Sequence, residues 1–260
     1  RLSRCSCTAP HPQVCQEKAR PICLRQDMRS LVVTSLAALV AAFAPRTCKP
    51  VEPASWAQID YDEYTRATWY AQEQETNSYQ PADELFCTAA TYELEGRQVD
   101  SAFGQPWDGL VISVYNQANK GVVNGPTNPR PEPLCGRVVE PENNRLSVAP
   151  CFLPNTLAGP YLPVILKADS TGRYTAVAVI GGQPTVPQAD GGCSLPPREE
   201  GNFNGNNEGL WILTRERIAP AALVEEIKAE LLSLGISPDN MLKVTQEGCS
   251  YEGYKIKPSE

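Results

Sequence analysis

From about residue 60 onward, the chain is a series of short β-prone segments separated by turns, and this pattern leaves few folds open. One of them, residues 86–94, alternates so that Thr88, Ala90 and Tyr92 share one face. Eight segments are predicted to be strands: residues 69–75, 86–94, 110–117, 134–140, 145–149, 162–168, 174–180 and 210–214. Closing such a sheet removes both exposed edges. We therefore predict an all-β fold, an eight-stranded antiparallel up-and-down β-barrel.

One C-terminal α-helix is predicted after the last strand. Leu223, Ile227 and Leu231 recur at helical spacing. Pro220 precedes them and Gly235 follows them, as expected at the two ends of a helix. The acidic residues between them are typical of a solvated helix face, so we assign them no catalytic role. The helix is expected to pack one apolar stripe on the barrel.

The first 44 residues are predicted to be a targeting presequence. Residues 31–44 form an apolar run that follows Arg29 and ends in Ala42-Phe43-Ala44. This run is too short to span a membrane, and its charged start and small-residue end are typical of a cleaved export signal. Residues 1–27 are rich in arginine and resemble an organelle transit segment. If the chain starts at Met28, the presequence would be a secretory signal without a transit segment. The remaining alternative is that residues 31–44 form a buried core helix.

The 10 cysteines predict a disulfide framework. Four fall within residues 1–44, and the domain keeps Cys48, Cys87, Cys135, Cys151, Cys193 and Cys249. An even number in an exported domain favours three disulfides, although spacing alone leaves about fifteen connectivities open. No C-x-x-C pair occurs among the six, so we predict neither a zinc site nor a redox pair.

The formal net charge of -7 and the absence of a Lys/Arg-rich stripe argue against a nucleic-acid partner, because phosphate binding needs clustered positive charge. The single histidine, His11, lies in the predicted presequence. Histidine-based triads and imidazole zinc sites are therefore not expected in the mature domain. We predict no catalytic residue, no metal and no cofactor.

Several motifs, taken in order, resemble those of the lipocalin family. Residues 67–70 (ATWY) and 86–92 (FCTAATY) are similar to the G-x-W-Y and C-x-x-A-x-Y strands of that family, with alanine in place of the glycine. The family's T-D-Y-x-x-Y motif is matched only by Asp169 and Tyr174. Residues 210–215 (LWILTR) match the third motif, just before the helix.

Residues 150–152 (PCF) and 246–249 (QEGC) particularly resemble chloroplast lipocalins of the thylakoid lumen. The lipocalin domain of violaxanthin de-epoxidase is a more distant resemblance. The resemblance implies a barrel and helix over residues 61–249, preceded by an extension at 45–60 and followed by a tail at 250–260. It also implies a location in the thylakoid lumen, with secretion as the alternative.

The resemblance implies a pairing for the cysteines. Lipocalins commonly join the second strand to the segment after the helix, which here means Cys87 to Cys249. Cys135 and Cys151 flank a predicted hairpin centred on Glu142-Asn143 and so can face each other. The remaining pair would be Cys48 and Cys193.

The resemblance further implies that Trp69 plugs the closed end of the barrel beneath Arg215, and that the cavity above takes a small hydrophobic ligand such as a lipid, fatty acid or carotenoid. With Trp69 inward, alternation places Ala71 and Glu73 inward as well. A loop at residues 77–84 is expected to gate the mouth. The predicted ligand-binding residues are Ala71, Tyr79, Phe86, Thr88, Ala90 and Tyr92. A dry core filled by the same side chains is the alternative.

Two other functions stay open. A violaxanthin de-epoxidase-like enzyme would need an acid that protonates an epoxide, and Glu73 is the inward acid that alternation supplies. A non-catalytic lumenal subunit of a photosynthetic membrane complex would use the loops of the barrel. Two long insertions, residues 121–133 and 183–208, are typical of functional or disordered loops, and we expect disorder over most of the second.

Overall fold

The computed structural model of the chain describes residues 47–53, 58–95, 109–127, 133–140, 144–197 and 208–259. The predicted presequence, with His11 and four of the cysteines, lies outside the described residues. The centre of the predicted hairpin at Glu142-Asn143 also lies outside them.

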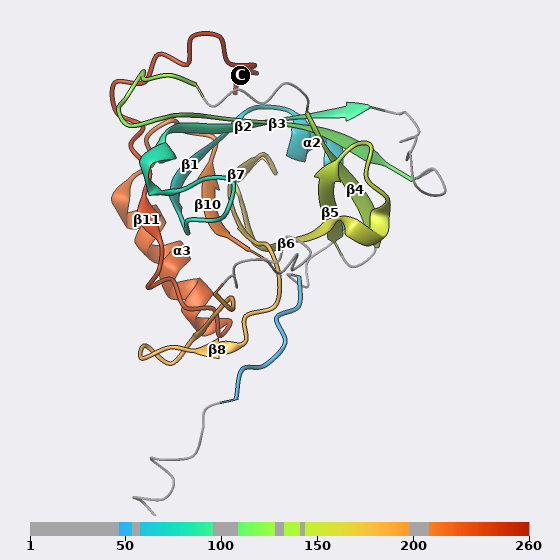
Figure 1. Cartoon of the computed structure of the whole chain (residues 1–260), viewed down its shortest axis with the longest axis vertical. Coiled ribbons are helices and arrows are strands. Elements are labelled where there is room, and N and C mark those ends of the chain that lie inside the picture. The colour runs from blue at the N-terminus through green and yellow to red at the C-terminus, as the bar shows by residue number, and fades with distance from the viewer. Residues whose placement is uncertain are drawn as a thin grey trace, which may run out of the picture. The chain divides into compact units, whose positions relative to one another are not determined.

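Strands of the described residues close into an antiparallel barrel, which Figure 1 views nearly along its axis. They are β1 (Trp69–Gln74), β2 (Phe86–Glu95), β3 (Val111–Asn119), β4 (Leu134–Glu140), β5 (Arg145–Pro150), β6 (Gly159–Ala168), β7 (Tyr174–Ile180) and β10 (Leu210–Thr214). Each strand pairs with its neighbour, and β10 returns to pair with β1. The predicted eight-stranded up-and-down barrel is therefore confirmed. A short strand, β11 (Leu242–Lys243), adds to β1 from outside this ring.

The predicted C-terminal helix is confirmed as α3 (Ala221–Ser233), which lies outside the ring of strands (Figure 1). Its buried residues are Val224, Ile227 and Leu231, whereas Leu223 is only partly buried. They join a core cluster with outward side chains of the wall, among them Ile212 of β10. The helix thus covers apolar side chains that the alternation of the strands turns away from the barrel interior.

A β-bulge in β1 corrects the expected orientation of Glu73. Ala71 is opposite Leu213 on β10 and Glu73 is opposite Ile212, so that Gln72 is an extra residue in β1. Glu73 therefore turns outward, and its Oε2 lies 3.2 Å from Nζ of Lys228 on α3. The expectation that Glu73 faces the interior is wrong, because alternation cannot be continued through a bulge.

Two one-turn 3-10 helices, one short α-helix and one small hairpin complete the described elements: α2 (Tyr61–Thr65), η1 (Ala82–Glu84), η3 (Asn155–Leu157), β8 (Val186–Pro187) and β9 (Cys193–Ser194). Asp60 caps α2 by accepting from the backbone N–H groups of Asp62 and Glu63 at 3.0 and 3.1 Å. This cap fixes the short helix that carries Tyr64.

The second insertion contains the β8–β9 hairpin, so the expectation of disorder is wrong for residues 183–197. A disulfide joins Cys193 to Cys48. The backbone N–H of Cys193 donates to the carbonyl of Gly235 at 2.9 Å, and its carbonyl accepts from Ser237 at 2.9 Å. The hairpin is thereby held against the end of α3. Residues 198–207 of the same insertion lie outside the described part of the chain.

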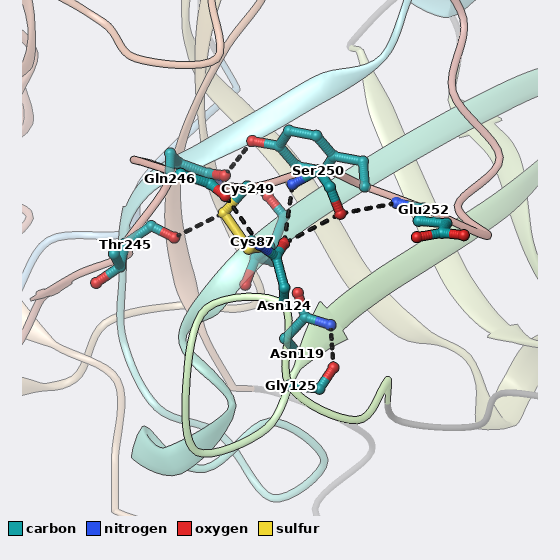
Figure 2. Close-up of a disulfide and its surroundings, with 12 residues drawn as sticks. Cys87, Asn119, Asn124, Gly125, Thr245, Gln246, Cys249, Ser250 and Glu252 are labelled. Carbon is teal, nitrogen blue, oxygen red and sulfur yellow. Dashed lines mark hydrogen bonds between the residues drawn. A yellow bond between two sulfur atoms is a disulfide. The ribbon is translucent and has the colours of Figure 1, made fainter.

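The C-terminal residues 249–257, here called the strap, lie along the outside of β1 and β2. Figure 2 shows the disulfide between Cys87 and Cys249 at its start. Further along, Tyr251 is buried against Tyr70, with 5.2 Å between the two ring centroids. Near its end, the backbone N–H of Thr68 donates to the carbonyl of Lys257 at 3.2 Å. The strap supports a seam where β1 and β2 share only two aligned pairs.

Candidate functional site

The interior of the barrel holds a cavity of about 290 Å³. Its wall is mainly apolar and includes Ala71, Ala90, Val114, Val148, Val179 and Leu213. These residues come from β1, β2, β3, β5, β7 and β10, because each strand turns alternate side chains inward. A space of this size suits one small molecule, and its walls offer mostly dispersion contacts.

Five of the six residues predicted to contact a ligand line this cavity: Ala71, Tyr79, Thr88, Ala90 and Tyr92. Phe86 is not among the lining residues. The register of β2 against β3 shifts between Phe86 and Ala89, and Cys87 has a positive φ of 53°. This break in the strand takes Phe86 out of the alternation. The backbone of Phe86 pairs with Asn119 on one side and with Thr245 on the other.

The mouth of the cavity is built by the loop after β1 and the residues before β10. Tyr79 is 38% exposed there. The side-chain amide of Gln80 donates to Thr88 Oγ1 at 3.0 Å and to the carbonyl of Glu84 at 3.2 Å. The backbone N–H of Ser78 donates to the carboxylate of Glu208 at 2.8 Å. These bonds hold the loop at residues 77–84 beside the mouth.

The closed end contains the stack that the resemblance implies. The guanidinium carbon of Arg215 lies 3.4 Å from the ring centroid of Trp69. Arg215 also donates to the carbonyls of Glu63 at 3.0 Å, Tyr64 at 2.9 Å and Ala67. Burial lowers the pKa of Arg215 to about 10, so it stays charged at neutral pH. The indole N–H of Trp69 donates to the carbonyl of Tyr64 at 3.0 Å, which ties α2 across this end.

Three tyrosine hydroxyls meet between the cavity and the closed end. The Oη atoms of Tyr64 and Tyr161 lie 2.6 Å apart, and those of Tyr92 and Tyr161 lie 3.1 Å apart. Tyr92 and Tyr161 line the cavity, and all three line a smaller void of about 10 Å³ beneath it. Burial raises the pKa of Tyr92 to about 12 and also raises the pKa values of Tyr64 and Tyr161. The three phenols are therefore neutral at physiological pH.

Sequence reasoning missed two residues that line the cavity, Tyr161 and Trp211, and the buried Gln74 opposite Trp211. Tyr161 precedes the predicted strand at residues 162–168, because β6 begins earlier, at Gly159. Trp211 could have been found from the alternation of residues 210–214, which places it on the same face as Leu213. Gln74 lies opposite Trp211, is fully buried, and has no hydrogen-bond partner for either amide atom within the described structure. Its position follows from the bulge, which no local signal marks.

The described residues offer neither a metal cluster nor a membrane-spanning helix. No group of three or more His, Cys, Asp or Glu side chains in them could hold a metal ion. No helix in the same part of the chain is long and apolar enough to cross a membrane.

Comparison with known proteins gives structural likenesses alone. No family model and no curated protein matches the sequence. A cockroach major allergen, Per a 4, is 19% identical, with 79% of this chain and 96% of that chain covered and a TM-score of 0.45. Lobster apocrustacyanin A1 is 15% identical over 78% and 96% of the two chains, with a TM-score of 0.45. Apocrustacyanin C2 is 14% identical over 78% and 96%, with a TM-score of 0.46. At these levels, the likenesses carry no conclusion about ligand or activity.

Proposed function

We propose that the protein is a lipocalin that holds one small hydrophobic ligand, such as a lipid, a fatty acid or a carotenoid-like molecule, and protects or transports it. The observation that carries this proposal is the cavity of about 290 Å³ inside a closed barrel with mainly apolar walls. Moving an apolar ligand from water into such a space is favourable by about 25 cal/mol for each Å² of apolar surface buried. The proposed contacts are Ala71, Thr88, Ala90 and Tyr92 along the wall and Tyr79 at the mouth.

The proposed location is the thylakoid lumen, reached after cleavage of residues 1–44. Three disulfides support a compartment where such bonds persist. Secretion is the alternative location. Mass spectrometry of the protein isolated from its source tests the cleavage: a mature N-terminus close to Pro45 supports it, and a chain that retains residues 1–44 contradicts it.

The enzyme alternative has less support. In a violaxanthin de-epoxidase-like reaction, Glu73 of β1 would have to protonate the epoxide. Glu73 instead faces Lys228 outside the barrel. Turnover of an epoxy-carotenoid at mildly acidic pH would nevertheless establish that activity. A role as a lumenal subunit of a photosynthetic membrane complex is the alternative that leads if no ligand binds.

The variant Ala90→Trp tests the carrier function. Ala90 is 8% exposed and lines the cavity, so an indole in its place should fill the space and weaken binding at least about tenfold. We expect saturable binding of one molecule per barrel by wild type, measured by native mass spectrometry and calorimetry with fatty acids, fatty ketones, retinoids and carotenoids. Ala229→Trp, on the exposed face of α3, is the matched control and should bind as wild type does. Absence of saturable uptake by wild type, or equal affinity of Ala90→Trp, would contradict the proposal.

A further inference from the structure

The deep end of the cavity is polar, unlike its walls. Tyr64 from α2, Tyr92 from β2 and Tyr161 from β6 bring their hydroxyls together, with Tyr161 in the middle. The rings of Tyr64 and Tyr92 stack with a centroid distance of 5.7 Å and an angle of 8° between their planes. The ring of Tyr64 also packs against that of Trp69, with 5.4 Å between the two centroids. These contacts fix the position of the hydroxyl cluster.

The cluster has one more hydrogen-bond donor than its own members can satisfy. Three neutral phenols carry three O–H protons, and the two contacts among them use two. No further acceptor for Tyr64, Tyr92 or Tyr161 hydroxyls occurs within the described residues. A buried donor without an acceptor is costly, so such a group favours a ligand that supplies one. Because Tyr92 and Tyr161 line the main cavity, a ligand there can reach the cluster.

The charges around the cavity favour a neutral acceptor over a carboxylate. None of the described lining residues is lysine, arginine or histidine, and Glu208 at the mouth is acidic. Arg215, behind the cluster, already donates to three backbone carbonyls and stacks on Trp69. A carboxylate moved to the deep end would lose its hydration and would gain only the charge of Arg215 behind the tyrosines, without a direct ion pair. A ketone, aldehyde or ester oxygen accepts the same hydrogen bond at a smaller desolvation cost.

We propose that the ligand is an apolar chain with a neutral carbonyl at the end that enters first. The hydroxyl of Tyr161, which accepts from Tyr64 and Tyr92, donates its own O–H to this carbonyl. The inference rests on the proposed function and adds the chemical class of the ligand and its direction in the barrel. Tyr161 and Tyr92 are the residues that would determine specificity. The apolar walls would contact the rest of the ligand and would not discriminate between different polar end groups.

Three probes of equal carbon number separate these statements: methyl nonyl ketone, undecane and undecanoic acid. Calorimetric titration of the full domain should give an affinity for the ketone about five- to tenfold higher than for the alkane, the effect of one net hydrogen bond. The acid should bind more weakly than the ketone at pH 7. The variant Tyr161→Phe should abolish the preference for the ketone and leave the affinity for undecane equal to or higher than that of wild type.

Two further variants test whether the preference for the ketone depends on the hydroxyl cluster. Tyr92→Phe removes a second hydroxyl of the cluster and should also reduce the preference for the ketone. Tyr254→Phe removes a buried hydroxyl of the strap, outside the barrel, that has no hydrogen-bond partner among the described residues, so it should keep the full preference. Thermal melts of each variant without ligand establish that it is folded before binding is measured.

The outcomes distinguish this inference from the proposed function. If wild type binds none of the three probes, the proposed function fails together with the inference. If ketone and alkane bind equally and Tyr161→Phe changes neither affinity, the carrier function stands and the carbonyl inference is overturned. If undecanoic acid binds most tightly and Tyr161→Phe weakens its binding, the cluster selects a carboxylate. The proposal of a neutral carbonyl ligand would then be wrong.

Discussion

Three buried polar or charged side chains of this barrel differ in how their polar atoms are partnered. Arg215 is 7% exposed, and its guanidinium donates to backbone carbonyls and stacks on the ring of Trp69. Gln74 is completely buried with neither amide atom partnered in the described structure. Glu75, the next residue, is 9% exposed and has no cation within ion-pair distance in the same part of the chain. The end of β1 therefore carries polar side chains at a cost in stability.

Glu75 gives a prediction for the pH dependence of stability. Burial raises the pKa of its carboxyl from 4.5 to about 7. Because the folded-state pKa lies above that of the unfolded chain, the stability contributed by the protonated form is complete below about 4.5 and is lost as the pH rises through about 7. The loss amounts to at most about 3 kcal/mol.

The variant Glu75→Gln isolates this effect. Urea unfolding should show that the variant gains stability relative to wild type by about 2–3 kcal/mol between pH 5 and pH 8, since an amide does not ionise. The difference between the two proteins is the quantity to compare, because other groups titrate in both. A difference that stays constant over this pH range would show that the Glu75 carboxyl is not held in a desolvated site.

At the scale of elements, local patterns predicted most of the fold but not its irregularities. The eight strands and α3 could be predicted because alternation and helical spacing are visible within each segment. The wall residues Ala71, Thr88 and Ala90 follow from the same alternation. The bulge in β1 depends on register with β10, which is far away in the sequence, and it reversed the expected position of Glu73. The strap was expected only as a tail, because its packing depends on distant partners.

The disulfides at residues 87–249 and 135–151 give a prediction about element stability. The structure joins Cys87 to Cys249 and Cys135 to Cys151, the pairs expected for this chain, with sequence separations of 162 and 16. In the chain-entropy model, removing the first by a double Cys→Ser change should cost about 4–5 kcal/mol, and removing the second about 3 kcal/mol. Chemical unfolding of the two double variants measures these costs.

Peptide mapping without reduction is the independent check on that pairing. It should recover Cys87 linked to Cys249, Cys135 linked to Cys151, and Cys48 linked to Cys193. Cys87 linked to any other cysteine would refute the scheme. Equal stability of the two double variants would show that loop length does not control the contribution of these bonds.

On the scale of the whole molecule, the two ends of the barrel differ in structure: one is filled by a buried stack and the other opens into the cavity. The closed end holds Trp69, Arg215 and α2 in a buried stack that lies below the cavity. The other end holds the cavity mouth, with Tyr79 and Glu208 on connections between strands. Tyr64 links the two regions, because it supports Trp69 and also contributes a hydroxyl to the cluster under the cavity. The lipocalin resemblance predicted the stack, and alternation predicted Tyr92. Tyr64 and Tyr161 were not predicted, since Tyr64 lies before the first strand and Tyr161 before the expected start of another.

This division predicts that stability and binding separate. Trp69 is completely buried, and Trp69→Ala should cost about 3–5 kcal/mol because it leaves a cavity at the closed end and removes the ring beneath Arg215. Trp69 does not line the cavity, so the molecules that still fold should bind ligand with an affinity within about threefold of wild type. Thermal melts and calorimetry on the folded fraction measure the two effects. Ala90→Trp should show the opposite, with weakened binding and a smaller loss of stability. If Trp69→Ala kept full thermal stability and lost binding, the assignments of the two ends would be reversed.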